Sequence, residues 1–493
     1  MDPATQGNGV RAGMATMATR RTLRASCLVD RTERGVRPRA VWADDPEAHV
    51  QAVGASAAQA PILSLTSLAR GTLWLGCLST LGLLLQLLFQ IEAASLLGRS
   101  EFGYLAHTLS VCSFIPLLAQ FGSDRVLVRE LVQNRGRWQE IVQASLVQRL
   151  LLGSLASAGI VVGLMCAGDR LQLPVALALA VLGVISAMDL AHLFDSQGHS
   201  WRHSLAVAGR YLGYLVGVMA IHRAGCGSAV GTAWTMTAVS VVFLGYQLCY
   251  AMSQGWSPLQ RCPWRAVRRL FGQTWPVAIA TACIQVYVQG PVVILGFLAD
   301  KEEVGPVVIA VLAASVLAGT IGLAYRLLLP RLSAMFAASP GHAIAVVRRV
   351  SPLMLYVSTA CTAAAWLLSP LLLPVLGPQY ASAVPLMRIT LCAVPLVNWA
   401  SIYGTSFLAM RRVGPYFAAA AAGAATAVAL GVGLVKPYGG LGCAAALAGS
   451  QVVVALLSAA MFAAHAASHR TAPAGCADSA RPGPEAGTFE AAA

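Results

Sequence analysis

Apolar stretches about as long as a membrane is thick follow one another along most of the chain. Each holds about 20 residues, enough to cross ~30 Å of hydrocarbon as a helix. Because an open sheet would leave backbone groups unbonded in lipid, the pattern predicts an all-α, polytopic membrane protein of about twelve transmembrane helices. The predicted spans are 72–96, 104–122, 147–167, 173–194, 204–223, 229–251, 275–298, 304–325, 352–375, 383–410, 414–435 and 442–465.

Polar segments flank and divide these spans. Residues 1–70 are rich in Ala and Arg without an apolar period, which predicts a disordered cytoplasmic tail, and residues 467–493 predict a second one. A basic segment at 253–274 predicts a cytoplasmic linker. It would join a six-helix lobe at 71–252 to another at 275–466.

A short internal repeat supports this division into halves. The segment RSEFG at 99–103 follows the first span, and KEEVG at 301–305 follows the seventh, 202 residues later. RVLV at 125–128 closes the second span, and RLLL at 326–329 closes the eighth, 201 residues later. Since the offset covers an even number of spans, the two six-helix halves would share one orientation in the membrane.

Composition and charge agree with a membrane location. Hydrophobic residues make up 57% of the chain and charged residues 11%, whereas soluble domains carry about 25% charged residues. Of the 34 Lys and Arg residues, 27 fall on the side of the termini and five on the other. The positive-inside rule then predicts an inner-membrane protein with both termini cytoplasmic, and accounts for the net charge of +14 without a nucleic-acid partner.

Candidate chemistry is sparse. Most of the twelve cysteines lie inside apolar runs without a CxxC pair, so they are interpreted as small apolar residues. The sequence has no P-loop, GxSxG, HExxH or dinucleotide fingerprint. The predicted outer loops are too short to hold a catalytic domain. The chain is therefore expected not to be an enzyme, and to need no cofactor beyond a coupling H⁺ or Na⁺.

Four ordered motifs carry a family resemblance. They are LLGRSEFGYLA at 96–106, FGSDRVLVRE at 121–130, LGPQYASAVPLMRI at 376–389 and YGGLGCAAA at 438–446. Together they resemble the Wzx-like polysaccharide-export flippases, from the superfamily that also holds multidrug exporters and the lipid II flippase. The family often has Arg before the first Leu-Leu-Gly, where this chain has Ser95. Any role of that arginine is therefore not transferred.

The resemblance implies two six-helix lobes around a central cavity. It also implies translocation of undecaprenyl-diphosphate-linked oligosaccharide from the cytoplasmic to the outer leaflet, for exopolysaccharide, capsule or O-antigen. A polysaccharide polymerase and a chain-length regulator are then expected partners, beside the lipid-linked substrate and the bilayer.

Charged residues inside spans are costly, so each is a functional candidate. Arg210 in the fifth span could bind phosphate oxygens, or could form a buried pair with Asp189 on the fourth. Arg388 in the tenth span matches an arginine common in the family motif, and could bind substrate or reach the interface. Glu92 and Asp189 are the ion-coupling candidates, although Glu92 could equally be an interfacial carboxylate.

Other candidates are uncharged or lie at the membrane edge. Arg125 and Arg326 are related by the repeat. They could attract an anionic headgroup at the cytoplasmic rim, or they could act only by orienting the chain in the membrane under the positive-inside rule. Gln285, Gln289 and Asn398 could bond sugar hydroxyls or join helices to one another.

Two further function classes stay open. A multidrug/cation antiporter of the same superfamily would need an acidic cavity, whereas the charges inside these spans include arginines. A polysaccharide polymerase or ligase would need a substantial outer loop carrying catalytic groups.

Overall fold

A computed structural model describes residues 65–471, except 134, 168–172, 198, 258–262, 373, 375–376 and 411. These residues belong to one compact unit that spans Ala55–Ala493. The described part is helical throughout and shows no strand, which confirms the all-α prediction. Residues 1–64 and 472–493, most of the two predicted tails, lie outside the description.

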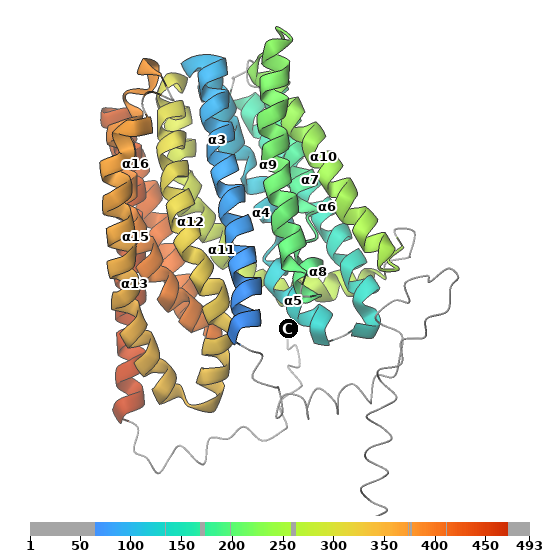
Figure 1. The fold of residues 1–493 in the computed structure, drawn as a ribbon, viewed down its shortest axis with the longest axis vertical. Coiled ribbons are helices and arrows are strands. Elements are labelled where there is room, and N and C mark those ends of the chain that lie inside the picture. Colours follow the sequence, from blue (N-terminus) through green and yellow to red (C-terminus); the bar gives the residue numbers. More distant parts are fainter. Residues whose placement is uncertain are drawn as a thin grey trace, which may run out of the picture. The chain divides into compact units, whose positions relative to one another are not determined.

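Long helices make up both halves of the chain (Figure 1). In the first half they are α3 (Leu65–Cys112), α4 (Phe114–Gln120), α5 (Ser123–Gln133), α6 (Trp138–Cys166), α7 (Leu173–Ala187), α8 (Ala191–Ser196), α9 (Ser200–Arg223) and α10 (Ala229–Ser253), with a 3-10 turn η1 (Arg135–Arg137). In the second half they are α11 (Trp264–Leu298), α12 (Lys301–Ala338), α13 (Pro340–Leu368), α15 (Ala383–Ala409) and α16 (Val413–Thr471), with 3-10 turns η3 (Ser369–Leu372) and η4 (Pro378–Tyr380).

Ten stretches of the described helices are long and apolar enough to cross a membrane. Two of them, Trp74–Gln120 and Val413–Ser468, are far longer than one crossing requires. Each contains a kink at a glycine with positive φ, Gly98 (φ 76°) and Gly439 (φ 54°), a conformation that other residues rarely adopt. Counting each of these two as a pair of crossings brings the ten to the predicted twelve, and the chain is a multi-pass membrane protein.

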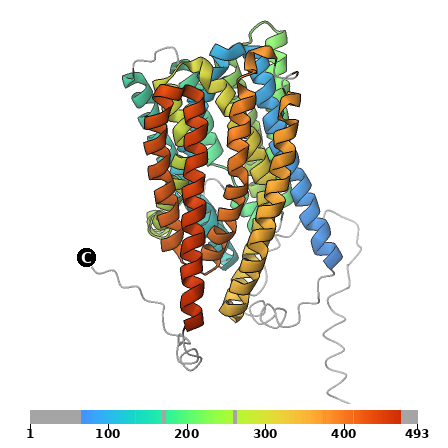
Figure 2. The ribbon, with the colours of Figure 1, turned by 90° about the vertical axis from the view of Figure 1, so that its left-hand side faces the viewer.

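The helices form two groups that follow the sequence. Helices α3 to α10 contact one another mainly through the pairs α3–α9, α7–α10 and α6–α7. Helices α11 to α16 do so through α11–α16, α12–α15 and α15–α16, and Figure 2 shows these helices from their own side. We call the groups the N-lobe and the C-lobe. The most extensive contact between the lobes joins α3 to α12.

The two ends of the bundle pack differently. The start of α3 and the end of α16 lie at one end, here called the termini end, and both helices turn back at the other end, here called the kink end (Figures 1 and 2). From the kink end inward, one hydrophobic cluster includes residues of both lobes, such as Phe102 and Val307. At the termini end each lobe has a cluster of its own, around Trp138 in the N-lobe and Phe407 in the C-lobe. The lobes are therefore packed together at the kink end, whereas at the termini end these two clusters stay separate and the lobes meet through α11 and α5.

Several helices extend beyond the predicted spans. α11 begins at Trp264, inside the segment predicted as a linker, and its Leu270 is buried against Leu127 of α5. α12 runs on to Ala338 past the predicted end at 325, and α13 follows from Pro340. A hydropathy pattern ends at the first charges, whereas the backbone hydrogen bonds of a helix continue past them.

Candidate functional site

A cavity of about 380 Å³ lies between the lobes. It is lined mainly by α3, α7 and α9 of the N-lobe, and α11 and α12 of the C-lobe close its other side. Its volume falls within the range of about 300–1,000 Å³ typical of small-molecule sites. The lining includes polar side chains from all five of these helices: Gln86, Gln90, Ser110, Ser186, Tyr211, Gln289 and Ser315.

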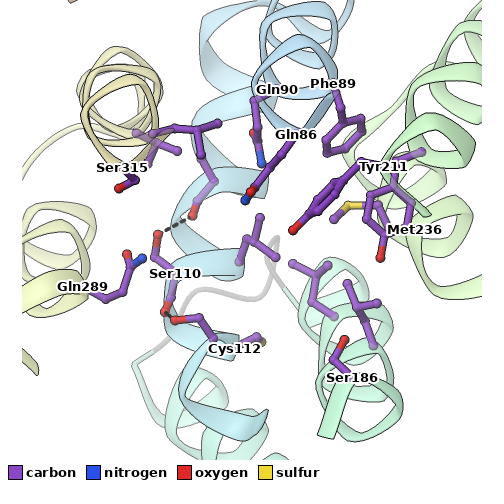
Figure 3. Close-up of a pocket in the computed structure, with 18 of the residues that line it drawn as sticks. Gln86, Phe89, Gln90, Ser110, Cys112, Ser186, Tyr211, Met236, Gln289 and Ser315 are labelled. Carbon is purple, nitrogen blue, oxygen red and sulfur yellow. Dashed lines mark hydrogen bonds between the residues drawn. The ribbon is translucent and has the colours of Figure 1, made fainter. Parts of the chain in front are cut away.

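Figure 3 shows how these side chains face the cavity. Gln86 and Gln90 lie on successive turns of α3, and both point towards Tyr211 of α9. Gln289 approaches from the C-lobe, on the side of Ser110. Since amides and hydroxyls both donate and accept hydrogen bonds, the wall suits a ligand that carries hydroxyl groups.

Arg210 is the charged residue of this lining, which contains no Asp or Glu among the described residues. Its guanidinium carbon lies 5.6 Å from the ring centroid of Tyr211. Its Nε is buried and has no hydrogen-bond partner in the described structure. A guanidinium at the wall of a cavity without carboxylates gives that cavity a positive potential, and such a group binds phosphate oxygens well.

The alternative pair between Arg210 and Asp189 is not formed at ion-pair distance, within 4 Å, in the described structure. Asp189 lies near the end of α7, and its Oδ1 accepts a hydrogen bond from the backbone N–H of Ala191 at 2.9 Å. The same oxygen lies 3.4 Å from Nδ1 of His203 on α9. Asp189 is thus occupied within the N-lobe, and Arg210 stays open to the cavity.

Of the uncharged candidates, only Gln289 lines this cavity. Gln285, one turn earlier on α11, donates from Nε2 to Ser113 Oγ of the N-lobe at 3.0 Å and so joins the lobes. Asn398 is buried in α15, where its Nδ2 donates to Ser358 Oγ of α13 at 3.1 Å. For Gln285 and Asn398 the contacts match the helix-joining alternative.

Arg388 lies on α15 outside the lining of the central cavity. Its Nε donates to Ser369 Oγ at 3.2 Å, and its guanidinium carbon lies 4.2 Å from the ring centroid of Trp366. Glu92 is half-buried on α3 and is also outside the lining. Arg125 and Arg326 belong to α5 and α12, but their side chains lie outside the description.

Sequence reasoning did not single out Arg149. Its side chain is fully buried, and it donates to Ser123 Oγ at 3.1 Å and to the carbonyl oxygens of Ala187 and Asp189 at 3.2 and 2.6 Å. It also donates to the Asp124 carboxylate. In the sequence it follows a cluster of arginines close to the end of a predicted span. It was therefore counted with the cytoplasmic arginines that set the orientation of the chain in the membrane. Ser110, Ser186 and Tyr211 were missed as well, because single polar residues in apolar runs give no signal of the face they occupy.

The family model described as "Polysaccharide biosynthesis protein" matches residues 68–336 of the chain. A search of curated proteins gives no match.

Solved structures show a related fold. An inward-facing multidrug resistance MATE family transporter of the MOP superfamily has a TM-score of 0.63 and 13% identity, covering 80% of this chain and 96% of its own. The lipid II flippase MurJ in an inward closed conformation has a TM-score of 0.61 and 11% identity, covering 80% and 87%. A MOP superfamily transporter from Pyrococcus furiosus, described as having a binding pocket of reversed polarity, has a TM-score of 0.56 and 13% identity, covering 81% of this chain and 96% of its own. At these identities the likeness shows the fold, that of MOP superfamily transporters.

Proposed function

Because the chain belongs to the polysaccharide biosynthesis protein family, we propose that it is a flippase for undecaprenyl-diphosphate-linked oligosaccharide. It would accept the substrate at the cytoplasmic leaflet of the inner membrane and release it at the outer leaflet by alternating access. The exported repeat units would feed a polysaccharide polymerase and its chain-length regulator.

The observation that carries this proposal is the charge of the central cavity. Arg210 meets no carboxylate there, while glutamines and hydroxyl groups line the remaining wall. A lipid-linked oligosaccharide presents a diphosphate beside sugar hydroxyls, and its lipid tail can stay in the bilayer. The guanidinium would bind the diphosphate, and Gln86, Gln90 and Gln289 would bond the adjacent sugar.

The packing of the lobes supports loading from the termini end. The lobes share a large hydrophobic cluster towards the kink end, whereas at the termini end each lobe has a cluster of its own and a small contact of Leu270 with Leu127 joins them. The excess of Lys and Arg on the side of the termini favours a cytoplasmic location for that end. Arg125 and Arg326, at this end, would attract the anionic headgroup before it enters.

Either an ion gradient or downstream consumption of the product would supply the driving force. Asp189 is the stronger coupling candidate because its Oδ1 lies 3.4 Å from Nδ1 of His203, so two ionisable groups stand side by side there. Glu92 is the second candidate. Arg388 would act at a later stage, since it lies outside the cavity in this conformation.

A multidrug/cation antiporter is the alternative that the fold allows, because MATE transporters share the fold. A cationic drug would meet Arg210 without a compensating carboxylate, and like charges in a low-dielectric site repel. A substrate with the opposite charge therefore fits the cavity better.

The test is complementation of a deletion strain with wild type, Arg210→Gln or Arg210→Lys. Wild type should restore surface polysaccharide. Arg210→Gln should reduce export by at least tenfold and should accumulate lipid-linked repeat units on the cytoplasmic side. Arg210→Lys should retain partial export, because a lysine keeps the charge but cannot form the bidentate hydrogen bonds of a guanidinium to phosphate oxygens.

Arg223→Gln is the matched control, because Arg223 is exposed in the last turn of the same helix, α9. It removes the same charge and should export normally at equal expression. The deletion strain could instead export polysaccharide normally and become sensitive to cationic drugs. That result would contradict the flippase assignment and support the antiporter.

A further inference from the structure

The C-lobe has a second hollow at the termini end, where α15 ends and where α16 both begins and ends (Figure 2). It is a groove of about 500 Å³, and it shares no lining residue with the central cavity. Small residues keep it open, namely Gly414, Pro415 and Ala418 at the start of α16 and Ala464 near its end. The buried Phe407 of α15 also lines it.

The polar groups of this groove are basic or neutral. They belong to Arg412, His465 and Ser468, and the described lining includes no Asp or Glu. Arg412 lies in the short turn between α15 and α16, where its backbone N–H donates to the carbonyl oxygen of Phe407 at 2.9 Å. It is exposed and forms no ion pair with any carboxylate that the structure describes. The turn therefore places a positive charge at the groove.

An apolar stripe leads away from the groove along α16. Ala464, Ala460, Leu456 and Val452 follow one another at intervals of four residues, so they form a continuous row on the helix surface. All four are exposed. This part of α16 is a membrane-spanning stretch, so the row contacts lipid chains. The groove thus joins a cation at the membrane edge to a surface for hydrocarbon chains.

We propose that this groove binds the headgroup of an anionic phospholipid, whose acyl chains lie along the stripe of α16. A guanidinium binds phosphate oxygens through paired hydrogen bonds, and basic pockets between helices at a membrane surface bind anionic lipid headgroups. A free phosphate would meet the same cation, but it would leave the apolar stripe unused.

The bound lipid would stabilise the end of the C-lobe. Its headgroup would contact the end of α15 and both ends of α16, which are joined at this point by the Arg412 turn. The site needs neither the central cavity nor the substrate of that cavity, so this inference goes beyond the proposed function.

Native mass spectrometry of the purified full chain in detergent, with phosphatidylglycerol added stepwise, tests the site. Arg412→Gln should raise the Kd of the first bound lipid by about tenfold, the effect of losing one charge-assisted hydrogen bond. Ala464→Trp keeps the charge but fills the groove, and it should weaken binding to a similar extent. Both positions are exposed, so both variants should fold normally.

Arg348→Gln is the matched control, because Arg348 is an exposed arginine of α13 outside the groove. It removes the same charge and should change the Kd by no more than about twofold, since solvent screens a distant exposed charge. Equal weakening by Arg412→Gln and Arg348→Gln would overturn the site, because binding would then follow the overall charge of the protein. An unchanged Kd in both Arg412→Gln and Ala464→Trp would also overturn it.

Two further ligands separate a lipid site from a phosphate site. Phosphatidylcholine, whose headgroup has no net charge, should bind the wild type more weakly than phosphatidylglycerol. Glycerophosphoglycerol, the same headgroup without acyl chains, should not displace phosphatidylglycerol at equal concentration. Displacement by it would contradict the lipid assignment and indicate a site for free phosphate. None of these measurements depends on polysaccharide export, which tests the flippase separately.

Discussion

Two arginines of the N-lobe, Arg149 and Arg210, are buried in very different surroundings. Arg149 donates to a carboxylate, a hydroxyl and two backbone carbonyl groups, which tie α5, α6 and the end of α7 together. Arg210 lies beside the ring of Tyr211 at the wall of a cavity and, among the described residues, has no carboxylate within ion-pair distance. A cation that holds a fold bonds to acceptors on neighbouring segments, whereas a cation that binds a ligand lines a cavity without a carboxylate beside it. The difference separates a structural from a functional intramembrane charge.

The largest loss of stability should follow Arg149→Met. Removing one partner of a buried ion pair typically costs about 3–5 kcal/mol. Because the Asp124 side chain is 48% exposed and can be hydrated, we expect about 3 kcal/mol, near the lower end of that range. Thermal unfolding of the purified protein in detergent should show a clear fall in Tm. Arg149→Lys should recover only part of it, since one ammonium cannot bond to the acceptors at 123–124 and at 187–189 as a planar guanidinium does. An unchanged Tm in Arg149→Met would show that Arg149 does not stabilise the fold, and its contrast with Arg210 would fail.

The sequence predicted the membrane fold well because hydropathy reports on lipid contact directly. It placed the kinked pairs of spans on either side of Gly98 and of Gly439, where positive-φ glycines turn the chain. It did not predict that α11 begins as early as Trp264 or that α12 continues to Ala338. Burial of Leu270 against Leu127 depends on packing between distant segments.

The candidate site was predicted only in part, for a similar reason. Residues as costly as Arg210 in a span stand out in any sequence. Whether a side chain faces a cavity depends on the rotation of its helix, which an apolar run does not encode. Arg388 therefore seemed equivalent to Arg210, yet it packs on Trp366 outside the cavity. Gln289 and Arg210 meet at one cavity only through the docking of two lobes.

A smaller effect is expected at Asn398, an uncharged counterpart of Arg149. Asn398→Leu removes the hydrogen bond to Ser358 between α15 and α13, and such bonds in membrane proteins contribute about 0.6 kcal/mol on average. The Tm should fall slightly while export continues. Ser358→Ala supplies a double-mutant cycle, in which the combined loss should be smaller than the sum of the single losses. Loss of export at an unchanged Tm would instead place Asn398 on the substrate path.

The smallest effect on stability should come from Arg210→Leu, although it removes a charge from the interior. Arg210 has no carboxylate within ion-pair distance among the described residues, so its loss leaves no buried anion unpaired. Removing a desolvated cation with few partners can even stabilise the fold. The Tm should therefore stay level or rise while export is lost, the reverse of the result for Asn398→Leu. A Tm that falls as far as in Arg149→Met would show that Arg210 also serves the fold, through a partner it gains in another conformation. The nearby Asp189 is the first residue to examine, and Asp189→Asn should then reproduce the loss.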